Sequence, residues 1–356
     1  MQTAVRQHFQ QLLHINCPDS KPITLTAVAA ARLIDRIDNI RLHAHSYSLL
    51  HNLTYGSLKP VDILNFSFEH ELHGINIHVD DGGEHSLSHS HAEALARFKQ
   101  RAERLNLAIH LETSHTGREE INRVVRIAQA LGVQNIRAYP RYEGQLTDVM
   151  AQVVADLRTM GELADKHDLY FDIEQHETLK STEIVHMLLA VNHPRLHVLF
   201  DFTNMINAYE RPLPALRTLA PYIRQVHLKG AKTIREGNGY GRLGVVQSSA
   251  EDETPYGRML YELLMLGEAK PQVICFALEQ EVNYYAPAYR RADEGRNPYL
   301  PYKEPSDTPF NDANPGMSLL KERRWAANQV HFIKSLLAEL RWLAQSLCEN
   351  GQQTND

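Results

Sequence analysis

Three acidic side chains and one histidine mark the ends of short apolar runs in the second half of the chain: Glu174, Asp201, His227 and Glu279. Each run is predicted to be a β-strand, so the four residues stand on four consecutive strands. Adjacent strands lie about 4.8 Å apart, and side chains from neighbouring strands can therefore surround one ion. Three carboxylates and one imidazole, without a thiolate, suit a hard or borderline divalent cation. Mn²⁺ fits best, and Mg²⁺, Co²⁺ and Zn²⁺ are alternatives. A buried network of ion pairs is the competing interpretation.

Histidines are abundant elsewhere in the chain, with 20 in 356 residues. His78, His110 and His176 are predicted at or near strand ends, where they would bind a substrate or orient the metal ligands. Lys229 follows His227 by two residues and is a candidate catalytic group. The remaining strands also end in ionisable side chains, which supports a functional site at that end of the sheet.

The elements that must position these residues alternate between strands and helices about eight times. Strands are predicted at 40–45, 74–80, 107–112, 135–139, 169–174, 196–201, 224–229 and 273–279. Eight strand–helix units predict a closed parallel (β/α)8 TIM barrel, whose active site lies at the C-terminal ends of the strands. A doubly wound open sheet is the alternative, but no G-x-G-x-x-G motif follows any strand.

One domain is expected to span residues 1–356. Within it we predict an N-terminal helical extension at 1–37, a barrel core at 38–283, an excursion after the eighth strand at 284–316 and a C-terminal helix at 317–348. This last helix is predicted to be the eighth barrel helix, with a dimer contact as the alternative.

Composition excludes several classes of protein. Lys and Arg number 37 against 43 Asp and Glu, a net charge of −6, which argues against binding to nucleic acid. No apolar stretch reaches the roughly 18–20 residues of a membrane helix, and the start has no secretory signal. Cys17, Cys275 and Cys348 are far apart and are expected to be reduced thiols. We therefore expect a cytoplasmic protein that contacts neither nucleic acid nor membrane.

Four sequence segments carry a resemblance to a known family. Residues 171–177 (FDIEQHE), 199–204 (LFDFTN), 225–229 (QVHLK) and 277–279 (ALE) resemble the metal-ligand strands of the sugar phosphate isomerase/epimerase superfamily, the xylose isomerase-like barrels. The similarity spans roughly residues 38–283. It implies a divalent metal held by the four residues named first. It also implies keto-sugar or hydroxy-ketone substrates and chemistry through an enediolate or enolate.

The residues around these ligands depart from the ketose 3-epimerases of the superfamily. Those enzymes place a second Glu where Lys180 stands, a His where Asn204 stands and an Arg where Thr233 stands. Their common His-x-Lys-Asp sequence ends here in Gly230. The metal-ligand pattern is complete, whereas the pattern around it is not. Asn204 is predicted to contact substrate.

This difference bears on the expected reaction. Epimerisation needs two bases on opposite faces of one carbon, a task that Glu174 and Glu279 could perform. Carbon–carbon cleavage beside a ketone needs a Lewis acid and one proton donor. Lys229, Lys232, Arg235 and Arg242 could attract an anionic substrate, with a solvated basic loop as the alternative.

Lyases of the superfamily, including a 3-oxo-isoapionate decarboxylase, resemble this chain in having long insertions, here at 230–253 and 284–316. We therefore predict a lyase that decarboxylates a 3-oxo sugar acid, with a keto-sugar isomerase or epimerase as the alternative. An endonuclease IV-like repair enzyme and a non-catalytic sugar-binding barrel are more remote alternatives. The predicted partner is a small sugar or sugar acid, and a homo-oligomer is compatible with the sequence.

Overall fold

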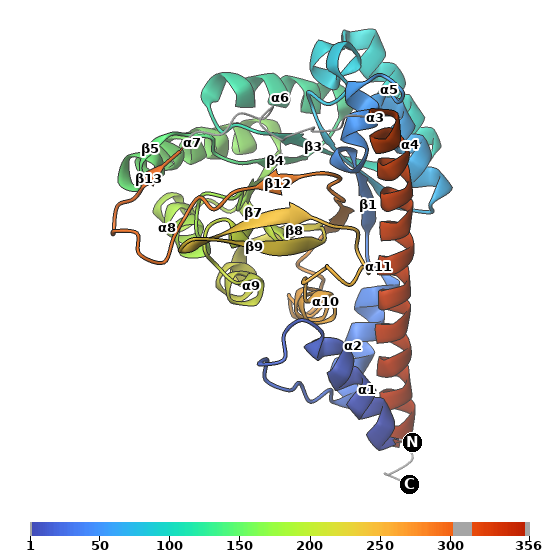
Figure 1. The fold of residues 1–356 in the computed structure, drawn as a ribbon. Helices are drawn as coiled ribbons and strands as arrows, with labels where there is room; N and C mark the ends of the chain where they lie inside the picture. The colour runs from blue at the N-terminus through green and yellow to red at the C-terminus, as the bar shows by residue number, and fades with distance from the viewer. Residues whose placement is uncertain (1, 302–314, 353–356) are drawn as a thin grey trace.

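Eight parallel strands close into a barrel in the computed structural model, which describes residues 2–301 and 315–352 (Figure 1). In order around the barrel they are β1 (Leu42–His45), β2 (Gly74–His78), β3 (Ala108–Thr113), β4 (Asn135–Ala138), β6 (Tyr170–Glu174), β7 (Leu196–Asp201), β8 (Ile223–Leu228) and β11 (Cys275–Leu278). β11 pairs with β1 and closes the ring. The predicted TIM barrel is confirmed.

The strand register sets which side chains meet inside the barrel. Asp201 lies beside His227 across the β7–β8 pair, and His227 lies beside Ala277 across the β8–β11 pair. Asn76 of β2 lies beside His110 of β3, and His78 lies beside Glu112. The predicted second strand, 74–80, ends earlier, at His78. Residues two apart on one strand face the same side, so each strand contributes to successive layers of the interior.

Helices cover the outside of the barrel and bury their apolar faces on it. They are α4 (Pro60–Glu69), α5 (Ala92–Arg104), α6 (Arg118–Leu131), α7 (Leu146–His167), α8 (Ser181–Val191), α9 (Pro212–Leu219) and α10 (Tyr256–Leu264), and a short helix, α3 (Leu50–Thr54), precedes α4. Gly132 ends α6 at a φ of 71°, a backbone conformation that favours glycine. Short 3₁₀ turns occupy Ser46–Leu49, Gly83–His85, Leu87–His89, Asn204–Ile206 and Ala220–Tyr222.

The N-terminal extension consists of α1 (Gln2–His14) and α2 (Ala27–Asp38), which lie along the long terminal helix α11 (Pro315–Gln352) (Figure 1). The Thr26 side chain accepts a hydrogen bond from the backbone N–H of Ala29 and caps α2. α11 is longer than the predicted 317–348 and lies outside the barrel after β11, in the place of an eighth barrel helix. Among the described helices, none is both long and apolar enough to cross a membrane.

The two insertions form small sheets beside the barrel. β9 (Ala231–Glu236) and β10 (Gly239–Gly244) make an antiparallel hairpin, to which β12 (Tyr285–Ala286) adds a third strand. β13 (Tyr299–Leu300) pairs with β5 (Gly144–Gln145). The segment 230–253 is therefore partly strand. Of the predicted excursion 284–316, residues 302–314 lie outside the described part of the chain.

Candidate metal centre

The four residues predicted to bind a metal come together at the C-terminal end of the barrel. Glu174 ends β6, Asp201 ends β7, His227 lies in β8 and Glu279 follows β11. One ligand atom from each lies within 4.8 Å of the others, and all four side chains are buried. Parallel strands of one barrel end at the same rim, which is why positions about 100 residues apart in sequence converge here.

One buried atom of each of the four side chains has no hydrogen bond of acceptable geometry: Glu174 Oε2, Asp201 Oδ2, His227 Nδ1 and Glu279 Oε2. His227 Nδ1 lies 2.9 Å from Glu279 Oε2 and 3.5 Å from Glu174 Oε1. Each of the three carboxylate oxygens lies within ion-pair distance of a cation, Arg137 for Glu174 and Lys229 for the other two, so the buried ion-pair network expected as the alternative is also present. Three carboxylates and one imidazole that converge in this way fit a divalent ion.

Glu112 orients the imidazole of His227. Its Oε1 lies 2.9 Å from His227 Nε2, and its Oε2 lies 2.8 Å from His45 Nε2. Burial disfavours the charged form of Glu112, but Arg137, His45 and His227 outweigh burial and hold the pKa of Glu112 well below its usual range. An ionised Glu112 accepts a hydrogen bond from the Nε2–H group of His227. The other ring nitrogen, Nδ1, then faces the other three proposed ligands.

The charge of His227 depends on these carboxylates. Burial opposes its charged form, yet Glu112 and Glu279 raise the pKa of His227 well above its usual value. Without an ion the imidazole is therefore protonated, and a metal that binds Nδ1 must displace that proton.

Lys229 lies behind the proposed ligands. Its Nζ is 3.0 Å from Asp201 Oδ2, 3.1 Å from Glu279 Oε2 and 3.0 Å from Glu281 Oε1. Burial raises the pKa of Asp201 to about 6, although Lys229 counteracts this effect. The same lysine keeps the pKa of Glu279 well below its usual value despite burial. The neighbouring carboxylates Glu279 and Glu174 also raise the pKa of Asp201, whereas the pKa of Glu279 is lowered. Nζ is positioned to neutralise the ligands.

A cleft of about 350 Å³ opens above the centre, and Glu279 and Glu281 line one part of it. His78 and His176, both predicted to bind substrate, also line the cleft. His176 stacks on Tyr139, with ring centroids 3.8 Å apart and planes 4° from parallel. The other lining residues are His45, Tyr47, Leu50, Thr54, Asp80, Asp81, Ser114, His115, Arg137, Arg141 and Tyr284.

The other two predicted substrate contacts, His110 and Asn204, are not among the residues that line this cleft. His110 lies two residues before Glu112 on β3, one layer deeper, and its Nδ1 is 2.7 Å from Gln225 Oε1. Asn204 is buried and donates from Nδ2 to Glu174 Oε1 at 3.0 Å. Asn204 therefore holds a proposed ligand in place.

The expected basic cluster is divided among separate ion pairs. Lys232 pairs with Glu251 at 2.8 Å on the surface. Lys180, which stands where the 3-epimerases have a second Glu, pairs with Glu294 at 2.5 Å. Arg242 is fully buried and pairs with Glu281 and with Glu177. A pattern of basic residues in a loop does not reveal acidic partners that the fold supplies from elsewhere.

Two arginines that line the cleft, Arg137 and Arg141, were not among the predicted site residues. The Arg137 guanidinium lies 2.5 Å from Glu112 Oε2 and 3.1 Å from Glu174 Oε2. Arg141 donates to the Tyr139 hydroxyl at 2.5 Å. The sequence signal that could have identified Arg137 and Glu112 is their position at strand ends.

The fold and the sequence define the class of protein. A family model described as the xylose isomerase-like TIM barrel matches residues 69–258, more than half of the chain, and the protein belongs to that family. It is 39% identical over 319 residues to the uncharacterized protein YihM of Escherichia coli (strain K12), covering 89% of this chain and 97% of YihM.

Two further proteins are similar to this chain, one over part of its sequence and the other in its fold. A 3-oxo-isoapionate decarboxylase of Pectobacterium atrosepticum is 22% identical over 147 residues, which cover 41% of this chain and 53% of that enzyme. The crystal structure of a D-psicose 3-epimerase superposes with a TM-score of 0.56 at 13% identity, covering 84% of this chain and 99% of that one. At this identity the superposition establishes the shared fold.

Proposed function

We propose that the protein is a cytoplasmic, divalent metal-dependent lyase that decarboxylates a 3-oxo sugar acid, with Mn²⁺ as the ion. Glu174, Asp201, His227 and Glu279 are the proposed ligands. The observation that carries the choice of reaction is the asymmetry of the cleft. Of these four residues, Glu279 is the one whose side chain lines the cleft described above. Such a site offers a substrate one ligand carboxylate rather than two opposed bases.

The proposed reaction breaks the bond between the carboxylate carbon and its neighbour. Carbon dioxide leaves, the electron pair is delocalised toward the adjacent ketone, and a proton returns to carbon. A bound divalent ion would supply the Lewis acid for that ketone. Arg141 and Arg137 both line the cleft; Arg137 already pairs with Glu112 and Glu174, so Arg141 is the proposed contact for an acidic substrate. His78 and His176 are the proposed proton donors or hydroxyl contacts on the same cleft.

In this proposal Lys229 positions and neutralises ligands, because its Nζ contacts Asp201, Glu279 and Glu281. The partial similarity to a 3-oxo-isoapionate decarboxylase supports the substrate class. A keto-sugar epimerase is the second candidate. One observation favours it: Glu174 and Glu279 both approach His227 Nδ1 and therefore flank one point.

The test combines elemental analysis with carbon-13 NMR of keto-sugars and 3-oxo sugar acids in D₂O. We expect about one divalent ion per chain at this centre and bicarbonate from a 3-oxo acid. Deuterium exchange beside the ketone without loss of carbon would replace the lyase with the epimerase. Failure to load an ion at this centre, at the mouth formed by the C-terminal ends of the barrel strands, would overturn the proposed metal-dependent activity.

Glu279→Gln is the matching variant, because glutamine keeps the size of the side chain and removes its charge. We expect the fold to persist, metal affinity to fall and turnover to drop at least about 100-fold, as for the loss of an electrostatic stabiliser. Glu268→Gln, at an exposed position, is the control. Full activity in Glu279→Gln would contradict the assignment of the site.

A further inference from the structure

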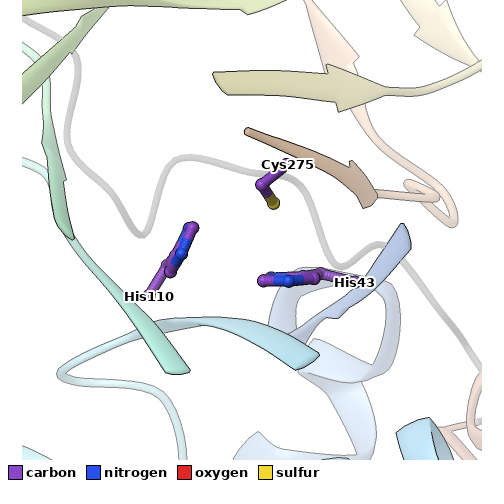
Figure 2. Close-up of side chains that lie close together, drawn as sticks. All are labelled: His43, His110 and Cys275. Atoms are coloured by element: carbon purple, nitrogen blue, oxygen red, sulfur yellow. The ribbon is translucent and has the colours of Figure 1, made fainter. Parts of the chain in front are cut away.

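A second group of side chains with metal-ligand chemistry lies inside the barrel. His43 of β1, His110 of β3 and Cys275 of β11 project into the same space from three strands (Figure 2). One nitrogen of each imidazole and the Cys275 sulfur lie within 4.8 Å of one another, and all three residues are buried. The interior of such barrels is usually filled by branched apolar side chains, so a layer of this composition requires an explanation.

Amide side chains orient both imidazoles. His43 Nδ1 lies 3.0 Å from Asn76 Oδ1, and His110 Nδ1 lies 2.7 Å from Gln225 Oε1. The Asn76 amide is itself held by Glu112, whose Oε1 accepts from Asn76 Nδ2 at 3.0 Å. Rings that are fixed through a second partner in this way are typical of metal-binding histidines.

The Gln225 amide is oriented in the same manner, since its Nε2 donates to Asp172 Oδ2. The Cys275 thiol contacts Asn76 Oδ1 at 3.3 Å. Gly74 leaves the room that the His43 ring occupies, because a Cβ at Gly74 would lie 2.8 Å from His43 Nε2. The second ring nitrogen of His110, Nε2, lies 3.1 Å from Asn135 Nδ2, and an ion bound at that nitrogen would displace this hydrogen bond.

Both imidazoles are available as neutral ligands. Burial lowers the pKa of His43 well below its usual value and that of His110 to about 4. Burial also raises the pKa of the Cys275 thiol. Cys275 therefore stays protonated until a cation binds, and metal binding would release that proton to solvent.

We propose that His43, His110 and Cys275 bind a transition-metal ion of the Zn²⁺ class, at a site separate from the mouth of the barrel. One thiolate and two imidazoles select a borderline-soft ion, in contrast to the carboxylate-rich centre above. The ligand atoms would contract to about 3.4–3.8 Å from one another, as bond lengths of about 2.0–2.3 Å require. The ion would link β1 to β11, the pair that closes the ring, and to β3. This inference does not depend on the proposed reaction.

Cobalt provides a specific test, because a Co²⁺–thiolate bond gives a charge-transfer absorption that carboxylate and imidazole ligands do not give. The wild-type protein would be produced in medium supplemented with Co²⁺ and compared with Cys275→Ser. We expect the absorption band in the wild type and its loss in Cys275→Ser. The Co²⁺ content of Cys275→Ser should be lower than that of the wild type by about one ion per chain. No band in the wild type, or an unchanged band in Cys275→Ser, would overturn the proposal.

Two controls make the result specific. Cys17→Ser removes another buried thiol, one that belongs to no group of candidate ligands in the described chain, and should leave the band intact. Glu279→Gln should reduce metal at the mouth and also leave the band intact. If Cys17→Ser lost the band and Cys275→Ser kept it, the ion would be bound by Cys17 and the proposed site would be refuted.

A measurement on the wild type covers the case in which Cys275→Ser does not fold. X-ray absorption of the Zn²⁺-loaded protein should show one sulfur neighbour per chain at about 2.3 Å. A spectrum with only oxygen and nitrogen neighbours would refute the proposal.

Discussion

Two layers of polar side chains are stacked inside this barrel, and they differ in the charge of the groups that they contact. At the mouth, Glu279 and Asp201 face the ammonium group of Lys229. One layer deeper, His43 and His110 face the neutral amides of Asn76 and Gln225. Burial is nearly complete in both layers. The partners, rather than the depth, therefore decide whether a group is charged.

Two buried glutamates outside the proposed ligand sets have pKa values that are shifted in opposite directions. Glu112 faces Arg137 and two histidines, and its pKa lies well below the usual range despite burial. Glu322 of α11 accepts hydrogen bonds from the backbone N–H groups of His51 and Asn52, at 2.6 and 2.9 Å. Burial raises the pKa of Glu322 to about 7, because these neutral donors only partly offset it. The cationic partners of Glu112 outweigh its burial, whereas Lys229 only partly offsets the burial of Asp201 and the donors at Glu322 do not outweigh its burial either.

The largest expected effect comes from removing the cation at the mouth. Lys229→Met should destabilise the metal-free protein by about 3–5 kcal/mol, because it leaves buried carboxylates without a compensating charge. Excess Mn²⁺ should restore part of that stability, which urea unfolding with and without the ion would measure. Lys232→Met, in an exposed pair with Glu251, is the control and should leave the free energy of unfolding nearly unchanged, because solvent screens the pair. Equal losses of stability in the two variants would mean that Lys229 does not compensate the charge of the buried carboxylates.

The next effect is a pH dependence that Glu322 imposes. Its pKa rises from 4.5 unfolded to about 7 folded, so the native state holds a proton that the unfolded state releases. The free energy of unfolding should therefore fall as pH rises from about 4.5 to 7, by on the order of 3 kcal/mol. Glu322→Gln should remove this slope in urea titrations at several pH values. An unchanged slope, matching that of the exposed control Glu71→Gln, would show that Glu322 ionises freely in the folded protein.

The smallest effect concerns orientation of a proposed ligand. Glu112→Gln keeps a hydrogen-bond acceptor near His227 Nε2 but removes the charge that fixes the Nε2 proton. Mn²⁺ affinity should fall by about 10–100-fold, the range found when a partner of a metal-binding histidine is lost. Titration followed by electron paramagnetic resonance measures this change. Wild-type affinity in Glu112→Gln would mean that His227 is oriented by packing alone.

The barrel and the convergence at its mouth could be predicted from the sequence, because both follow from strand order. Glu174, Asp201 and His227 each lie at or near a strand end, and parallel strands bring such ends to one rim. Glu279 follows the same rule one residue after β11. The strand boundaries shifted by at most two residues, since hydrophobic pattern specifies an element better than its ends.

Depth inside the barrel could not be predicted. His110 and Glu112 are two residues apart and face the same side of β3, so the pattern cannot tell which of them reaches the mouth. The answer depends on how far β3 is staggered against its neighbours, which no local signal reports. Likewise, the pairing of Arg242 with Glu177 and Glu281 depends on how the β9–β10 hairpin folds back over the barrel.

The arrangement of α1, α2 and α11 has a consequence for how the molecule is made. Arg341 of α11 pairs with Asp38 at the end of α2, 303 residues earlier, and Glu339 pairs with His8 of α1. On the ribosome α1 and α2 emerge before the barrel, whereas α11, on which they pack, follows all eight barrel strands. Until α11 has been synthesised, apolar side chains of α2 such as Leu33 lack the surface on which they are buried in the folded protein. That interval is when a chaperone would have the most surface to bind.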